Sequence, residues 1–240
     1  MTGFFGQPRG WMGLARACMG YYDQPQLMHA LGEFWADFVI ESSRRALEEV
    51  DVDFVQVWED MAYNHGSLIS PDLFREFMTP YYQRVTRFTR EHGVDVILCD
   101  CDGNVNELVP LFLEVGVNGL YPLEIVAGTD PLAIREKFPD FLLLGGIDKI
   151  ALARGPDAID REIEKASQLM QRGGYIPFTD HRVPSDVPLA NFQYYMLRKR
   201  EMIGGELTPS LTELANARQE ALKPPQPFTH KPQPRGPSLE

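Results

Sequence analysis

Cysteine is scarce in this sequence: only Cys18, Cys99 and Cys101 are present. An odd number of thiols in a chain of 240 residues does not make a disulfide framework, so we expect Cys99 and Cys101 to be reduced. Long apolar runs are also absent, since none approaches the roughly 20 residues that cross a bilayer. The N-terminal stretch MTGFFGQPRG carries no basic segment followed by an apolar one. These absences predict a cytoplasmic protein with no membrane partner.

Positive charge is in short supply, with 23 basic against 34 acidic residues and a formal net charge of -11. This balance argues against nucleic acids and anionic membranes as partners, and favours a cation, a cationic cofactor or a cationic partner. The dinucleotide-binding pattern G-x-G-x-x-G follows none of the predicted strands, which disfavours a nicotinamide or flavin site. Residues 208–240 are proline-rich and lack periodicity, so we expect a disordered tail after a domain at 1–207.

Apolar residues alternate between strand-like runs and helix-like spacing along the rest of the chain. A strand followed by a helix, repeated several times, predicts right-handed βαβ units and a parallel sheet, either open or closed into a barrel. The predicted strands are 53–60, 94–100, 119–125, 141–147 and 173–180. The predicted helices are 25–50, 70–88 with a kink or division at Pro80, 105–115, a short one after Asp130, 156–171 and 187–203.

Each predicted strand ends in side chains that ionise or bind metals. These residues are Glu59 and Asp60; Asp100, Cys101 and Asp102; Glu124; Asp148; and Asp180 and His181. The C-terminal ends of parallel strands converge on one rim, where active sites of α/β proteins lie. Carboxylates crowded there bind a cation, share protons at a raised pKa, or stay solvated. The alternative for any single residue is that it caps the following helix, as Asp102 or Asp148 would.

The stretch ILCDCDGN, residues 97–104, places two thiols and two carboxylates on alternate positions. Successive side chains of a strand point to opposite faces, so Asp100 and Asp102 share one face and the two cysteines share the other. Asp, Cys and His are all competent ligands for zinc or another divalent metal. The pattern therefore allows a metal site, an acid–base pair or a simple turn.

Four segments together resemble the uroporphyrinogen decarboxylase superfamily, which also contains corrinoid-dependent methyltransferases. The segments are residues 58–82, 102–124, 142–152 and 173–195. The resemblance implies a (β/α)8 TIM-type barrel with its site at the C-terminal rim. Family members carry the first barrel strands in a part that precedes the point matching Thr2. We therefore expect an incomplete, N-terminally truncated barrel with about five to six parallel strands. The sixth would be a short N-terminal stub at residues 3–5.

The methyltransferase branch of this family holds zinc with a His-x-Cys pair and a later Cys. By resemblance, Asp100 takes the place of that His, Asp102 that of the Cys, and His181 that of the later Cys, with Cys101 as a lower-ranked ligand. The predicted catalytic or ligand groups are Glu59, Asp60, Asp102 and His181. Glu124 and Asp148 are predicted to bind substrate or orient the others. A corrinoid protein is the implied partner.

The decarboxylase branch uses neither metal nor cofactor, and by resemblance His181 would contact a tetrapyrrole there. The arginines and the aspartate that serve that branch lie in the part before Thr2, and an acidic rim repels a polycarboxylate. A third interpretation is a non-catalytic fragment that binds a small molecule, forms a homo-oligomer, or pairs with a complementing N-terminal chain. The first interpretation, a metal-assisted methyltransferase-type enzyme, is our prediction from the sequence.

Overall fold

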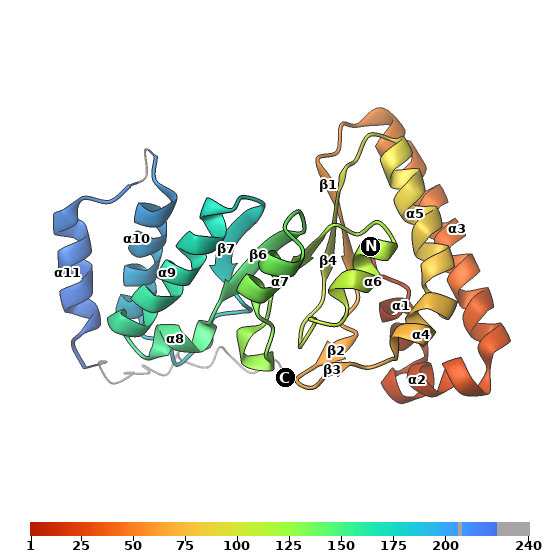
Figure 1. The fold of residues 1–240 in the computed structure, drawn as a ribbon, viewed down its shortest axis with the longest axis horizontal. Coiled ribbons are helices and arrows are strands. Elements are labelled where there is room, and N and C mark those ends of the chain that lie inside the picture. The colour runs from red at the N-terminus through yellow and green to blue at the C-terminus, as the bar shows by residue number, and fades with distance from the viewer. Residues whose placement is uncertain (206–207, 225–240) are drawn as a thin grey trace, which may run out of the picture.

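A parallel sheet of five strands forms the centre of the computed structural model, which describes residues 1–205 and 208–224 (Figure 1). The strand order is β1-β4-β5-β6-β7, so each strand lies beside the next sheet strand along the chain. A doubly wound sheet reverses its order at a switch point, and this sheet does not. The order is that of a (β/α) barrel that stays open, as predicted. The five strands are Phe54–Trp58, Val96–Asp100, Gly119–Tyr121, Leu142–Ile147 and Tyr175–Thr179.

The two faces of the sheet differ in burial. Paired residues of parallel strands point to the same face, and Val57, Cys99, Leu120 and Leu143 follow one another across the sheet on the covered face. All four are fully buried. The opposite face, which we call the open face, carries several partly or largely exposed side chains, as in β6, where every second residue is half-buried, whereas Leu98 of β4 is buried there.

Helices at the N-terminal end build one flank of the sheet (Figure 1). They are α1 (Gly6–Met12), α2 (Leu14–Asp23), α3 (Pro25–Glu49), α4 (Pro71–Phe77) and α5 (Thr79–Glu91). Pro25 and Pro71 occupy first helical positions, where a missing N–H costs nothing, and the Ser70 hydroxyl accepts from Leu73 N. The helix divides at Met78, and Pro80 lies in the first turn of α5, which confirms the predicted division at this proline. Helices α1 and α2 were not predicted.

The middle of the chain is less regular than expected. It holds the short hairpin β2 (Ala62–Tyr63) and β3 (Gly66–Ser67), α6 (Val109–Glu114), the 3-10 turn η1 (Ile125–Ala127) and α7 (Pro131–Lys137). Strand β5 ends at Tyr121, four residues before its predicted end, because Pro122 has no N–H to donate to the ladder. The Asp130 carboxylate accepts from Leu132 N and Ala133 N at 3.0 and 3.1 Å, which is the predicted cap of α7.

The C-terminal flank consists of four helices around a second apolar cluster. They are α8 (Lys149–Ala153), α9 (Pro156–Gln171), α10 (Leu189–Ile203) and α11 (Leu211–Ala221). The prediction of a disordered tail from residue 208 is wrong over α11. Ser210 and Glu213 form a capping box there, and Leu214 and Ala221 are buried. The remainder of the predicted tail, residues 225–240, lies outside the described residues.

Residues at the N-terminus extend the sheet beyond β1. Thr2 pairs with Trp58 in parallel, and Gly3 N donates to Trp58 O at 2.7 Å. The predicted stub strand is thus present as a single bridge one residue earlier than expected. Among the helices of the described residues, none combines the length and the apolar character needed to cross a membrane.

Candidate functional site

Four of the predicted residues gather at the C-terminal rim of the open sheet: Asp60, Asp100, Asp102 and His181, which we call the rim group. They lie at or directly after the C-terminal ends of β1, β4 and β7, strands that lie apart in sequence. The closest contact joins His181 Nε2 and Asp102 Oδ2 at 3.2 Å. Their side chains are 31% and 36% exposed, so a small molecule can reach the pair. Asp102 therefore contacts a histidine instead of capping the next helix.

Asp60 is held beside Asp102 by an arginine that the sequence did not indicate. Arg9 of α1 lies 3.6 Å from Asp60 Oδ2 and donates to Asp60 O at 2.8 Å. Asp60 Oδ1 in turn accepts from the backbone N–H of Asp102 at 3.5 Å. Arg9 escaped detection because its helix was not predicted, and a lone arginine on a short helix carries no motif. The guanidinium supplies the positive charge closest to Asp60.

Asp100 sits at the end of β4 on the open face, between β1 and β5. Gln56 Nε2 donates to Asp100 Oδ2 at 3.4 Å, and the Tyr121 hydroxyl hydrogen-bonds the same carboxylate. Burial and, after it, the nearby charges of Asp102 and Asp60 raise the pKa of Asp100 to about 6, against the opposing effects of the Tyr121 contact and of His181. Burial also raises the pKa of Asp102, while His181 lowers it. Asp100 is thus a carboxyl group that exchanges its proton near neutral pH.

A second set of charged residues lies next to the rim group and contacts the backbone beside it. It consists of Glu124, Lys149 and Asp180, and we call it the anchor group. Lys149 Nζ lies 3.1 Å from Glu124 Oε1 and 3.5 Å from Asp180 Oδ2. The fully buried Asp180 also accepts from Lys149 N and Ile125 N, both at 2.9 Å. Glu124 Oε2 accepts from Gly103 N at 3.1 Å, which fixes the backbone next to Asp102.

Gly103 has no room for a side chain at this point. Its φ is +89°, and a Cβ would come within 2.7 Å of the backbone of Ala62 and Tyr63. The turn after Asp102 is therefore set by a glycine and by Glu124 together. Glu124 was predicted to bind substrate or orient the others, and in the structure it contacts Lys149 and the backbone N–H of Gly103. Lys149 was missed, although it directly follows a predicted strand end.

Asp148 and Glu59 lie at strand ends but are engaged elsewhere. The Asp148 carboxylate accepts from Ile150 N at 2.8 Å and caps α8. The sequence had allowed this role as the alternative to a site residue. Glu59 is fully buried and accepts from the backbone N–H groups of Phe4, Phe5 and Gly6 at 2.7 to 2.9 Å, and from the Tyr82 hydroxyl. Burial raises the pKa of Glu59, and these hydrogen bonds oppose the shift. The structure therefore gives both residues structural positions outside the rim group, which corrects their predicted placement.

The cysteines point away from the rim group, as the alternation of the strand predicts. Cys99 and Cys101 are fully buried, and Cys101 Sγ accepts from Met61 N at 3.4 Å. Burial raises the pKa of the Cys101 thiol far above neutral, which opposes the thiolate form that a metal requires. Within residues 1–205 and 208–224, no three His, Cys, Asp or Glu side chains are grouped to hold a metal ion. The predicted donor set of Asp100, Asp102, His181 and Cys101 does not fit a metal in this arrangement.

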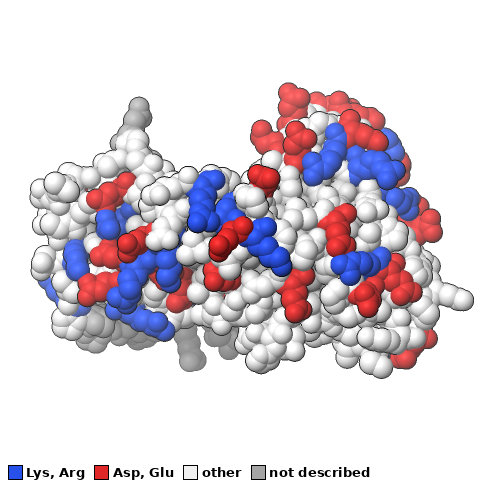
Figure 2. All heavy atoms as spheres, viewed as in Figure 1, with Lys and Arg blue, Asp and Glu red and all other residues white. Residues whose placement is uncertain are grey.

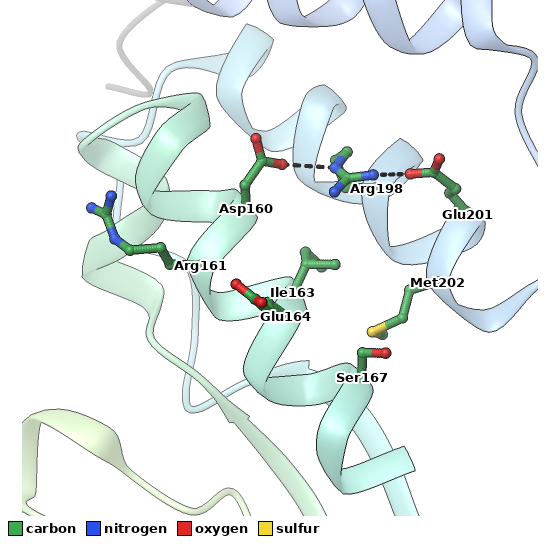
Figure 3. A pocket seen from close by; sticks show the side chains of 8 residues that line it. All are labelled: Asp160, Arg161, Ile163, Glu164, Ser167, Arg198, Glu201 and Met202. Atoms are coloured by element: carbon green, nitrogen blue, oxygen red, sulfur yellow. Dashed lines mark hydrogen bonds and ion pairs between the residues drawn. The ribbon is translucent and has the colours of Figure 1, made fainter. Parts of the chain in front are cut away.

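The hollow between α9 and α10, of about 500 Å³, lies away from the rim group (Figure 3). Three of the charged side chains that line it contact one another. Arg198 Nε donates to Asp160 Oδ1 at 2.7 Å, and Arg198 also pairs with Glu201. The Tyr194 hydroxyl donates to Asp160 at 2.8 Å. These contacts join α10 to α9.

The fold and the rim define an open (β/α) barrel with a candidate acid–base site at the C-terminal ends of its strands. The sequence model of the uroporphyrinogen decarboxylase (URO-D) family matches residues 9–202. That match covers most of the chain, and the protein therefore belongs to the URO-D family.

A methyltransferase from Methanosarcina mazei has a similar structure, with a TM-score of 0.58 at 20% sequence identity. The similarity covers 92% of this chain and 57% of the methyltransferase, so the chain spans little more than half of that protein. At this level of identity the likeness shows the fold alone. A comparison with curated proteins finds no match.

Replacing Glu59 tests its structural position. In a Glu59→Ala variant the N–H groups of residues 4–6 and the Tyr82 hydroxyl lose their buried acceptor. We expect the free energy of unfolding in urea to fall by about 3 kcal/mol or more, since each stranded buried donor costs roughly 1 to 3 kcal/mol. The exposed Glu91→Ala is the matched control, for which a change within about 0.5 kcal/mol is expected. An equal loss in both variants would contradict this assignment.

The raised pKa of Asp100 makes stability depend on pH. The pKa is about 6 in the folded protein against 3.8 ordinarily, so the folded state favours the proton. Its contribution to stability is present below about pH 4 and is lost as the pH rises through about 6.

An Asp100→Asn variant should escape that loss. We expect equal stability at pH 4 and a gain of about 1 kcal/mol at pH 7.5, roughly 2 to 4 °C in melting temperature. Calorimetry across this range measures the difference, with the exposed Asp23→Asn as control. A difference that stays constant with pH would exclude the raised pKa.

Proposed function

We propose that this protein is a methyltransferase-type enzyme of the URO-D family, in which the rim group moves a proton at a small-molecule acceptor. The observation that supports the proposal is the His181–Asp102 pair at 3.2 Å beside Asp100, whose pKa is about 6. A histidine oriented by a carboxylate is a general base, and general bases act best with a pKa near the working pH. The positions of these residues at the open C-terminal rim agree with where barrel enzymes bind substrate.

The proposed step is the activation of a thiol acceptor. His181 takes the proton of the acceptor thiol through Nδ1, because Nε2 faces Asp102. The sulfur becomes a thiolate, and the thiolate forms the new bond to the methyl group as the donor leaves. Asp102 orients His181 and stabilises its positive charge. Asp60 and Arg9 hold Asp102 from one side, and the anchor group holds the following backbone from the other.

The methyl donor under this proposal is a corrinoid carried by a partner protein. The donor is a substrate of the reaction, and the rim group needs no metal ion of its own to activate the acceptor. The net charge of -11 favours a partner with a basic docking surface. A metal-assisted reaction is not proposed, because the donor set does not fit a metal ion.

Carboxy-lyase chemistry on a tetrapyrrole is the second candidate. The observation that favours it is again Asp100, because a carboxyl with a pKa of about 6 still carries a proton at mildly acid pH and can give it to a carbon. The acidic rim argues against it, since it repels the carboxylates of such a substrate. The two reactions call for opposite protonation states of Asp100, and this difference separates them.

The experiment measures methyl transfer from methylcobalamin to 2-mercaptoethanol by the change in the cobalamin absorption spectrum. His181→Asn and Asp102→Asn should each lower kcat/KM by about 100-fold or more, as expected for the loss of a general base. His92→Asn, a histidine at the end of α5, is the matched control and should leave the rate unchanged.

The pH profile of the same assay tests the role of Asp100. In the methyltransferase reaction kcat/KM should rise through about pH 6, because the ionised carboxylate supports the positive charge on His181, and Asp100→Asn should flatten this rise. The carboxy-lyase would be favoured if the protein decarboxylates a tetrapyrrole carboxylate at a rate that falls above pH 6 and shows no methyl transfer from methylcobalamin. The absence of both activities in the wild-type protein would overturn the proposal.

A further inference from the structure

The His181–Asp102 pair does not hold its own geometry. Its side chains are 31% and 36% exposed, and an ion pair that is open to water contributes little to stability. The two residues also follow different strands, β7 and β4. The distance between them is therefore set by the backbone segments that carry them, and by whatever joins those segments.

Lys149 differs from the other ion-paired cations of the protein in its burial. Acidic and basic side chains lie intermixed on the face seen in Figure 2, where water screens them. Of the lysine and arginine side chains that form ion pairs in residues 1–205 and 208–224, that of Lys149 is the least exposed, at 13%. Its partners Glu124 and Asp180 are 20% and 0% exposed. Charges interact more strongly here than at the surface, because less water lies between them.

The segment of His181 is held through Asp180. Asp180 directly precedes His181, and its fully buried carboxylate accepts from Lys149 N and Ile125 N, both at 2.9 Å. Lys149 Nζ lies 3.5 Å from Asp180 Oδ2. Burial raises the pKa of Asp180, and the N–H and the charge of Lys149 oppose this rise. Lys149 thus holds Asp180 with both its backbone and its side chain.

The segment of Asp102 is held through Glu124. Glu124 Oε2 accepts at 3.1 Å from the N–H of Gly103, the residue directly after Asp102. The other oxygen, Oε1, lies 3.1 Å from Lys149 Nζ, so the ammonium group also fixes the direction of this carboxylate. Without Lys149, the carboxylates of Glu124 and Asp180 would lie close together with no cation between them and would repel each other.

Lys149 is itself placed by contacts outside the rim group. It is the first residue of α8, and the Asp148 carboxylate caps this helix by accepting from Ile150 N at 2.8 Å. Asp148 N donates to Glu162 Oε2 of α9 at 3.1 Å, and Glu162 is buried. The backbone of Lys149 therefore has a fixed position, which limits the places that its ammonium group can reach.

From these contacts we propose that Lys149 is a positioning residue for the His181–Asp102 pair. Its ammonium group sets the distance between the two side chains by joining the carboxylates next to them. Lys149 neither touches the acceptor nor moves a proton. The contacts are independent of the reaction, whereas their effect on the rate rests on the proposed methyl transfer. Amide exchange measures the first, and methyl transfer the second.

Amide hydrogen exchange, followed by NMR, tests the contacts without an assay of activity. In Lys149→Met, the N–H groups of Gly103 and Ile125 should exchange about tenfold faster or more, because their acceptors lose the cation that holds them. Lys165→Met is the matched control and should match the wild-type protein, since Lys165 also pairs with a glutamate but is 55% exposed. The N–H of Leu73 in α4 is the internal reference and should exchange equally in all three proteins.

Methyl transfer from methylcobalamin tests the effect on the pair. Lys149→Met should lower kcat by about tenfold or more and leave KM for the thiol within about twofold, because the base is displaced and no group that binds the thiol is removed. Lys165→Met should keep the wild-type rate. In an Asp102→Asn background, Lys149→Met should change kcat by less than about twofold, because a residue that acts through the pair has no further effect once the pair is broken.

A milder variant keeps the inference testable if Lys149→Met does not fold, which circular dichroism checks. Glu124→Gln keeps an oxygen that can accept from Gly103 but loses the charge that Lys149 pairs with. It should show changes of the same kind, about threefold in exchange and in kcat, since a hydrogen bond to a neutral acceptor is weaker.

The outcomes separate this inference from the proposed function. Unchanged exchange at Gly103 in folded Lys149→Met, or in Glu124→Gln if only that variant folds, would overturn the inference. Losses of kcat that add up in the double variant with Asp102→Asn would also overturn it. A wild-type protein without methyl transfer would overturn the proposed function, and exchange at Gly103 would still decide whether Lys149 holds the segments of the pair.

Discussion

The buried carboxylate of Glu59 is the contact on which the N-terminal half of the structure depends. It accepts three backbone N–H groups from residues 4–6, and it lies so close to Gly3 that a Cβ there would come within 2.2 Å of it. These contacts fasten the N-terminal segment to the end of β1. They also set the direction of α1, and therefore place Arg9 beside Asp60. Glu59, which was predicted to be catalytic, thus positions the helix whose Arg9 contacts Asp60.

The position of the rim group likewise depends on the largely buried charges of the anchor group. Lys149 joins Glu124 to Asp180, and Glu124 holds the backbone of Gly103 after Asp102. Carboxylates this close repel one another unless cations or N–H groups separate them. Burial and the charges of Asp102 and Asp60 raise the pKa of Asp100 to about 6, and burial also raises the pKa of Asp102. The chemistry of the site follows from this partial burial of neighbouring carboxylates.

Much of the fold could be predicted from the sequence because it rests on local signals. Ser70-Pro71, Asp130-Pro131 and Pro80 mark helix boundaries through the backbone of one or two residues. Helix α11 was missed because its proline-rich surroundings hid a Ser210–Glu213 capping box, and because two of its apolar side chains are buried only by tertiary contacts. Strand β5 was predicted too long because apolar residues continue past Pro122.

The sequence by itself determined the parallel α/β order, the family and the acidic residues at the strand ends, because each of these can be recognised from the spacing or the type of residues. It also determined that Asp100 and Asp102 share a face opposite to the cysteines, because alternation is a property of any strand. Only the tertiary structure decided which acids meet. Asp102 contacts His181, which lies 79 positions further along the chain, whereas Asp148 and Glu59 accept hydrogen bonds from backbone N–H groups. Such partners depend on side-chain direction and on distances between strands, and a linear pattern contains neither.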